Sequence, residues 1–231
     1  MKWIRDNTGR FAQRPHYEPE ELDGECEDIV RAFLVQRHGK VEYPITTDDL
    51  TVLLETRAGS LDVYADLIDR GDDVEGVTVF ARGARPQVLI ARHLTEQHWS
   101  SNRFRTTATH ELGHVVFHDC LYQVEAEPLD LFPREKSNPA PEPECRREHM
   151  HSLSTVDWME WQAGYACGAY LIPRTAVKAV VAGLRNRAGW VATPSAGSQA
   201  GKAIIDAVSE SFETSKDAAR VRLIQLKYLA A

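Results

Sequence analysis

The sequence predicts an α+β fold in which a small sheet packs against helices. Apolar residues recur at helical spacing over several long stretches, and between two of these stretches the period changes to the alternation typical of strands. The chain has 231 residues, of which 43% are hydrophobic and 26% charged, so it can bury a sizeable core. This composition excludes disorder of the whole chain.

The first part of the chain is expected to be an arm followed by two helices. Residues 1–17 show no periodicity, and we expect a flexible N-terminal arm there. Apolar residues on one face predict a helix over about 19–36. Thr46-x-x-Asp49 is typical of a capping box and predicts the start of a second, shorter helix.

Three strands are expected next. Strict alternation over 61–66 predicts a half-buried strand. The apolar runs 77–80 and 88–90 flank a turn that contains Gly83 and Pro86, which predicts a hairpin. We expect the edge of this hairpin to be available for pairing with an extended peptide.

The middle of the chain predicts two helices separated by an insertion. Helical spacing covers 106–118, and Ser154-x-x-Asp157 caps a second helix that stops at Pro173. Residues 126–153 hold five of the eleven prolines, so we interpret them as an inserted loop without helix or central strand.

The C-terminal extension, 176–231, is predicted to be helical. It carries eight bases against four acids, a net +4 that leaves −11 for the rest of the chain. Helices over 202–212 and 215–229 resemble a helix-turn-helix, although this charge is weak for a nucleic-acid binder. The alternative is a docking element that grips a protein partner or completes the core. The second of these helices holds three bases, Arg220, Arg222 and Lys227.

Three domain segments are therefore expected: the arm 1–17, a domain over 18–175 that contains the insertion, and the extension 176–231. No apolar run reaches the ~18 residues of a membrane helix, and the first residues are unlike a signal peptide. Four scattered cysteines do not make a disulfide scaffold. We therefore expect a cytoplasmic protein with no membrane partner.

The most specific chemical signal is His110-Glu111-Leu112-Gly113-His114, an H-E-x-x-H sequence within a predicted helix. Residues four apart share a helical face, so both imidazoles can reach one metal ion. Glu111 is displaced around the helix, where it can meet a water molecule at the metal but is poorly placed to ligate.

A catalytic zinc site needs a third protein ligand. The metzincin pattern would place Gly at 117 and His at 120, but the chain has Phe117 and Cys120, which excludes that class. His118 continues the histidine series, yet it lies about 12 Å along the helix from His110, too far for one metal to bind both. We therefore interpret His118 as a supporting or packing residue.

A carboxylate on the next helix is the remaining option, and Asp157 and Glu160 are the candidates. Glu160 is favoured because small residues continue its face and would let that helix approach Gly113 closely. These small residues are Ala163, Gly164, Cys167 and Gly168.

Both motifs carry a family resemblance. The segment 103–118, which begins Arg103-Phe104-Arg105-Thr106 and contains the H-E-x-x-H sequence, resembles the active helix of the ImmA/IrrE metallopeptidases. The segment 160–166, with Leu171-Ile172-Pro173 after it, is similar to that family's second motif, although Gly164 stands where the family has Asn. The resemblance spans about 18–173.

The resemblance implies a zincin-type minimal metallopeptidase core with Zn²⁺ as its cofactor. It implies that His110, His114 and Glu160 are the metal ligands and that Glu111 is the catalytic general base. It also implies an endopeptidase acting on an intracellular regulatory protein, in particular a helix-turn-helix transcriptional repressor. The alternative is a DNA- or protein-binding regulator with a metal site and little turnover, for which DNA binding rests only on the basic extension.

Two weaker constellations stay open. Cys145-x-x-x-His149-x-His151, together with His118-x-Cys120, could form a second metal site, although zinc sites usually pair shorter spacings. A Ser or Cys nucleophile is disfavoured because none follows a strand at a sharp turn into a helix.

Overall fold

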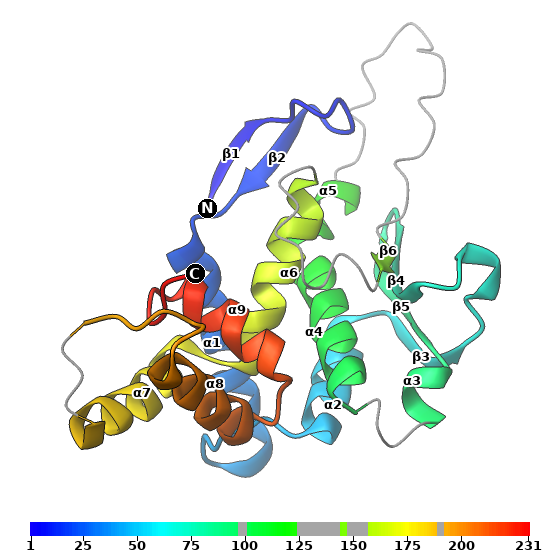
Figure 1. Ribbon diagram of the computed structural model, residues 1–231. Helices are drawn as coiled ribbons and strands as arrows, with labels where there is room; N and C mark the ends of the chain where they lie inside the picture. Colours follow the sequence, from blue (N-terminus) through cyan, green and yellow to red (C-terminus); the bar gives the residue numbers. More distant parts are fainter. Residues whose placement is uncertain (97–100, 124–143, 147–156, 189–191) are drawn as a thin grey trace, which may run out of the picture.

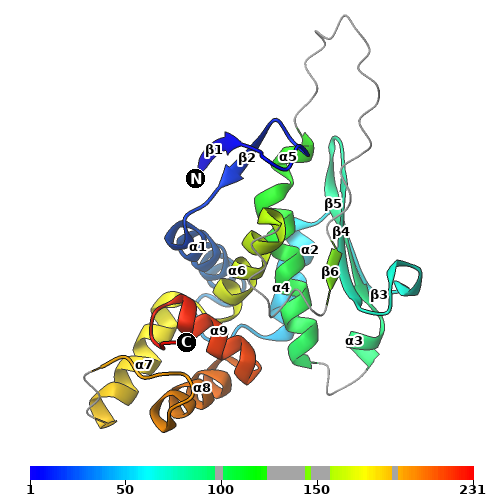
Figure 2. The same cartoon turned by 45° about the horizontal axis from the view of Figure 1, so that its top comes forward.

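A central helix, α4 (Ser101–His118), lies between a small sheet and a second helix, α6 (Trp158–Leu171), in the computed structural model (Figures 1 and 2). The structure describes residues 1–96, 101–123, 144–146, 157–188 and 192–231. The architecture is mixed α+β, with small sheets packed against helices, as the sequence predicts.

The N-terminal segment is a hairpin, so the expectation of an arm without regular structure was wrong. Strand β1 (Lys2–Arg5) pairs antiparallel with β2 (Gln13–His16). The Asp6 carboxylate closes the loop by accepting hydrogen bonds from the Thr8 hydroxyl and from the backbone N–H groups of Thr8 and Phe11. Strands of four residues are too short to show a period, and this loop chemistry leaves no apolar pattern.

The first two helices are confirmed. Helix α1 (Pro19–His38) ends at Gly39, whose φ of 74° is in the left-handed region that glycine accepts readily. Helix α2 (Thr47–Arg57) begins after Thr46, whose hydroxyl accepts a hydrogen bond from the Asp49 N–H at 3.0 Å, as the capping motif predicts.

The main sheet has the strand order β3-β5-β4-β6. The predicted hairpin is β4 (Val74–Ala81) with β5 (Ala84–Ala91), and the predicted strand β3 (Ser60–Ala65) pairs parallel with β5. Strand β6 (Glu144–Arg146) pairs antiparallel with β4. On the outer side of the hairpin, β6 pairs only with Val74–Val77, and among the described residues no strand pairs with the rest of β4, so the expected peptide-binding edge stays a prediction for that part of β4.

Strand β6 lies within the predicted insertion, where it is the edge strand of the sheet, so 144–146 are not loop. The rest of 126–153 lies outside the described residues. Short helical segments connect the larger elements: η1 (Ile68–Arg70), α3 (His93–Glu96) and α5 (Cys120–Gln123).

In the described part of the chain, four helices follow the insertion, and three predicted boundaries were wrong. The helix expected over 202–212 begins at Gln199. Helix α6 begins after Asp157, which is its N-cap, instead of near Ser154. The last helix ends before Lys227, where the chain turns with a φ of 61°. Among the described helices, none alone is long and apolar enough to cross a membrane. The remaining bounds are α7 (Arg174–Ala188), α8 (Gln199–Phe212) and α9 (Lys216–Gln225).

One hydrophobic core joins the N-terminal helices, the central pair and the C-terminal extension. Leu22 of α1, Leu112 of α4, Phe212 of α8 and Leu223 of α9 are all buried in the same cluster. The extension therefore completes the core that supports α4 and α6. Figure 1 shows α7, α8 and α9 gathered beside the lower end of α6.

Candidate metal centre

The metal-binding histidines predicted from the sequence lie on a helix that is buried on most of its surface. His110 and His114 are 1% and 0% exposed, because the sheet covers one side of α4 and α6 covers another. At the start of α4, Arg103 forms an ion pair with the buried Glu75 of β4. The Arg105 guanidinium donates a hydrogen bond to the Ile45 carbonyl at 2.9 Å. These contacts fix the helix against its neighbours.

The close approach of α4 and α6 that the sequence predicts is confirmed at Gly113. A Cβ at Gly113 would lie only 3.0 Å from the Cα of Ala163 and 3.3 Å from the Cβ of Ala166. Gly164 does not belong to this contact, because a Cβ there would meet no atom within 4 Å. The approach places Glu160, in the first turn of α6, beside the two histidines.

Three donor atoms converge from the two helices. The Nε2 atom of His110 lies 3.1 Å from the Nε2 atom of His114 and 3.1 Å from Oε2 of Glu160. His114 Nε2 lies 3.4 Å from Oε1 of Glu160. Tetrahedral zinc with bonds of 2.0–2.1 Å has ligand atoms about 3.3 Å apart, so these separations fit one zinc ion.

The charges of Glu160 and His114 shift each other's pKa values. Burial alone would raise the pKa of the Glu160 carboxyl, but the charge of His114 and hydrogen bonds from both histidines hold that pKa well below its usual range. Burial lowers the pKa of His114, yet the charge of Glu160 and its hydrogen bond raise it on balance. Glu160 is therefore an anion, as a metal-ligating carboxylate must be.

Glu111 is completely buried next to the cluster and points toward the sheet. Its Oε2 atom accepts a hydrogen bond from the Thr78 hydroxyl of β4 at 2.6 Å, whereas Oε1 has no hydrogen-bond partner. Burial raises the pKa of this carboxyl, although the charges of His114 and His110 act in the opposite direction. A buried carboxylate oxygen without a partner is costly, and a water molecule held at a neighbouring metal would satisfy it.

Gly76 makes room for this carboxylate. A Cβ at Gly76 would lie 2.6 Å from Oε1 of Glu111 and 2.7 Å from Cγ2 of Thr107, both closer than van der Waals contact. The side chain of Glu111 therefore occupies space that only glycine leaves open in β4.

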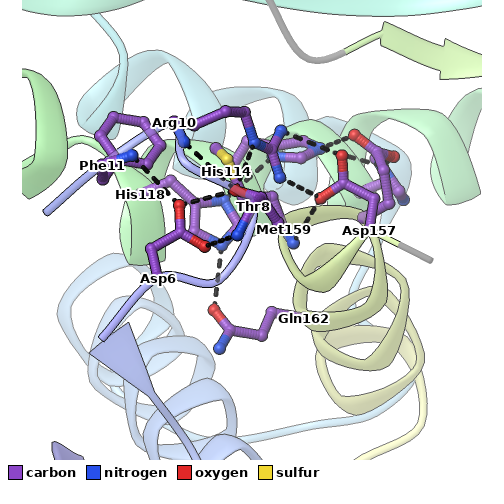
Figure 3. Close-up of polar contacts among 11 residues, drawn as sticks. Asp6, Thr8, Arg10, Phe11, His114, His118, Asp157, Met159 and Gln162 are labelled. Atoms are coloured by element: carbon purple, nitrogen blue, oxygen red, sulfur yellow. Dashed lines mark hydrogen bonds and ion pairs between the residues drawn. The ribbon is translucent and has the colours of Figure 1, made fainter. Parts of the chain in front are cut away.

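His118 contacts His114 and lies outside the cluster, as expected from its distance of about 12 Å along the helix from His110. Its Nδ1 atom lies 3.0 Å from Nδ1 of His114, and its Nε2 atom lies 3.0 Å from Oε1 of Gln162 (Figure 3). The Gln162 amide in turn donates a hydrogen bond to the Pro15 carbonyl of β2 at 3.0 Å. This row of contacts links the N-terminal hairpin to His114 of the candidate metal cluster.

Asp157 lies outside the cluster of possible ligands. Its two carboxylate oxygens accept hydrogen bonds from both terminal nitrogens of Arg10 at 2.7 and 3.0 Å, and Oδ1 also caps α6 by accepting from the Met159 N–H (Figure 3). Arg10 and Arg14 both lie over the ring of Trp158, at 5.7 and 5.0 Å from its centroid. The N-terminal hairpin is thus held against the start of α6.

The second metal site that the sequence left open gains no support. Cys120 is exposed, and His118 is engaged as described. The side chains of Cys145, His149 and His151 lie outside the described residues. In the described part of the chain, His110, His114 and Glu160 form the one group with metal-ligand separations.

Three contributors were missed by the sequence analysis. Thr78 and Arg10 lie far along the chain from the residues they contact, so no local pattern reveals them. Gly76 could have been found from the sequence, because an isolated glycine beside a strand pattern indicates that another part of the chain packs closely against the backbone there.

Comparison with known proteins adds no identification: no family model matches the chain, and no curated protein matches it. The resemblance to ImmA/IrrE metallopeptidases therefore depends on the two motifs quoted above. The described residues His110, His114 and Glu160, from two helices, form a group that could hold a metal ion.

Proposed function

We propose that this protein is a zinc-dependent endopeptidase with a zincin-type core. The observation that supports it best is the convergence of His110, His114 and Glu160 beside the buried carboxylate of Glu111. Three protein ligands leave a fourth position open, which separates catalytic from structural zinc sites.

Under this proposal, Zn²⁺ would be held by His110, His114 and Glu160, where it would polarise the peptide carbonyl and lower the pKa of water toward 7. Oε1 of Glu111 accepts the proton of the attacking water, and Thr78 holds the other oxygen in place. Glu111 then delivers that proton to the amine nitrogen as the C–N bond breaks. The raised pKa of Glu111 suits a group that both accepts and donates a proton.

The substrate class we propose is an intracellular regulatory protein, in particular a helix-turn-helix transcriptional repressor. This part of the proposal is supported by the motif resemblance, which implies regulatory proteolysis in the cytoplasm.

The test compares the wild-type protein with Glu111→Gln, which keeps the shape of the side chain and removes the proton acceptor. We expect about one zinc per chain in both proteins, and cleavage of a peptide library and of repressors encoded near the gene by the wild type alone. His114→Ala and Glu160→Ala should both lose zinc. Equal cleavage by Glu111→Gln would overturn the mechanism.

The competing hypothesis, a regulator with a metal site but little turnover, has a separate signature. It predicts bound zinc, no cleavage by either protein, and an affinity for duplex DNA that falls steeply with salt. One observation weighs against a DNA-binding extension: Arg222 is 1% exposed, so it cannot contact a phosphate.

A further inference from the structure

The geometry points to a hydrogen-bond relay, Pro15–Gln162–His118–His114, that fixes the tautomer of a metal ligand from the N-terminal hairpin. In this relay Gln162 and His118 are positioning residues: they act through His114 and do not touch the metal. The inference rests on the proposed zinc site, and it adds a role for two residues and for a segment outside the two motifs.

The orientation of the Gln162 amide follows from chemistry alone. A backbone carbonyl can only accept a hydrogen bond, so the group that faces the Pro15 oxygen at 3.0 Å must be the amide NH₂. The amide oxygen therefore faces Nε2 of His118, also at 3.0 Å. Gln162 is 1% exposed, so neither contact is exchanged for water.

The tautomer of His118 follows from the amide oxygen. Because that oxygen can only accept, Nε2 of His118 must carry the proton. His118 is fully buried, and its two nitrogens face an amide and another imidazole, neither of which balances a positive charge. The ring is therefore neutral, and its Nδ1 atom is an acceptor.

The tautomer of His114 then follows from His118. The two Nδ1 atoms lie 3.0 Å apart and need one proton between them, which His114 must supply. With a proton held on Nδ1, His114 has its Nε2 atom, which faces His110 and Glu160, left to bind a metal in place of the proton that it otherwise shares with Glu160. That atom is the one needed to bind a metal.

The relay also links metal binding to the N-terminal hairpin. Pro15 belongs to β2 and is buried, and the Arg10–Asp157 contact holds the hairpin loop against the same end of α6. Figure 3 shows the hairpin loop, His118 and Gln162 gathered at this end.

The test reads tautomers directly, by long-range ¹H–¹⁵N correlation spectra of histidine-labelled full-length protein at about pH 8, where an unperturbed imidazole is neutral. We expect the Nε2–H tautomer for His118 and a protonated Nδ1 for His114, with and without zinc. Zinc affinity is measured in parallel by chelator competition.

Three variants distinguish a hydrogen-bonding role of Gln162 from a general packing role. Gln162→Leu removes the acceptor and should mix the His118 tautomers and weaken zinc binding about 10–100-fold. Gln162→Glu has the same shape but puts a carboxylate beside His118 and removes the donor to Pro15, so it should favour a His118 ring protonated on both nitrogens and also weaken zinc binding. Thr109→Val, which removes a buried hydrogen bond to Cys167 at the same interface, should leave both unchanged.

The relay is overturned by an Nδ1–H tautomer for His118 in the wild type, by unchanged affinity in Gln162→Leu, or by an equal loss in Thr109→Val. These outcomes differ from failure of the proposed function. A protein that shows the expected tautomers but cleaves no peptide contradicts the endopeptidase and leaves the relay intact.

Discussion

At the scale of single residues, the position of Glu111 depends on Gly76, which has no Cβ atom. The carboxylate faces Gly76 and binds Thr78, two residues of β4 on the same face of the sheet. A proton acceptor must lie within hydrogen-bond reach of the water it activates, so a shift of about 1 Å matters as much as a change of residue type.

We therefore predict that Gly76→Ala keeps zinc and lowers the cleavage rate by roughly 100-fold. The added Cβ would collide with Oε1 of Glu111 and force the carboxylate to move, while His110 and His114 stay in place. Zinc content, melting temperature and initial cleavage rates give the answer. Gly24→Ala, where a Cβ meets no atom within 4 Å, is the control. A fully active Gly76→Ala protein would mean that this position of Glu111 is unimportant.

The residues of the candidate site differ in how far the sequence could predict them. His110, Glu111 and His114 stand in one continuous motif, so helical periodicity alone brings them together. Glu160 required a second helix and an argument about small residues. Asp157 looked equivalent to Glu160 by spacing, and only its contact with Arg10, far away in the sequence, shows why it is not a ligand.

At the scale of secondary-structure elements, helix starts follow local chemistry closely. Asp49, in the first turn of α2, is only 5% exposed and binds Thr46, Arg37 and His38 through its side chain. Burial alone would raise its pKa, but the hydrogen bonds from His38 and Thr46 and the charges of His38 and Arg37 lower it on balance. The ionised form therefore stabilises the folded state.

Asp49→Asn should consequently destabilise the protein in a pH-dependent way. Because the pKa is lowered on folding, the stabilisation is present above the unfolded pKa of about 3.9 and disappears as pH falls through the folded value. We expect a loss of about 1–3 kcal/mol in the free energy of unfolding at pH 7. Denaturant titrations from neutral to acid pH measure it, and a difference that stays constant down to the acid limit would contradict the assignment.

The contact between α4 and α6 sets the geometry of the candidate metal centre, because each helix supplies residues of the cluster. Gly113→Ala would place a Cβ 3.0 Å from the Cα of Ala163, so the helices must separate by a few tenths of an ångström. We expect weaker zinc binding, by about 10-fold, measured by chelator competition. Gly164→Ala, on α6 but facing open space, should bind zinc as the wild type does. Equal affinity in both variants would show that the helix spacing tolerates a methyl group.

Elements whose own residues contain a capping or periodicity signal were predicted. Elements that form only by pairing with distant parts of the chain were not. The helix caps at Thr46 and Gly39 act within a few residues, and α1 and α2 were found from periodicity and capping signals. Strand β6 has three residues and exists because β4 offers it an edge, so its own sequence carries no strand signal. The N-terminal hairpin likewise depends on its loop and on its contacts with α6.

At the scale of the whole molecule, the C-terminal extension is joined to the rest by a buried ion pair. The Arg222 guanidinium of α9 lies 2.5 Å from Oδ1 of Asp23 in α1, and its Nε donates to the Ile172 carbonyl at the end of α6. Tyr165 of α6 donates its hydroxyl to the other Asp23 oxygen, and burial raises the pKa of Tyr165 to about 12, so it stays a donor. Arg222 thus connects α9 with α1 and with the end of α6.

This arrangement supports the alternative in which the extension completes the core. Of the three bases expected in the last helix, Arg222 is buried in the core, whereas Arg220 and Lys227 are exposed. Sequence composition counts charges without showing which of them face solvent. Deleting 201–231 should therefore remove zinc binding and stability together, because the deletion exposes the core shared with α6 and leaves Asp23 buried without its partner.

Arg222→Met tests that role with a single side chain of similar length. We expect a loss of about 3–5 kcal/mol in the free energy of unfolding, since the change strands a buried carboxylate, whereas Asp23→Leu combined with Arg222→Met should recover much of it. Arg220→Met is the matched control, because Arg220 is 48% exposed and its nearest acid, Asp217, is 3.9 Å away, so less than about 1 kcal/mol should change. Equal stability of the two single variants in urea titrations would mean that the pair does not hold the extension. The double variant distinguishes a stranded charge from lost packing, because only a stranded charge is relieved when Asp23 is also replaced.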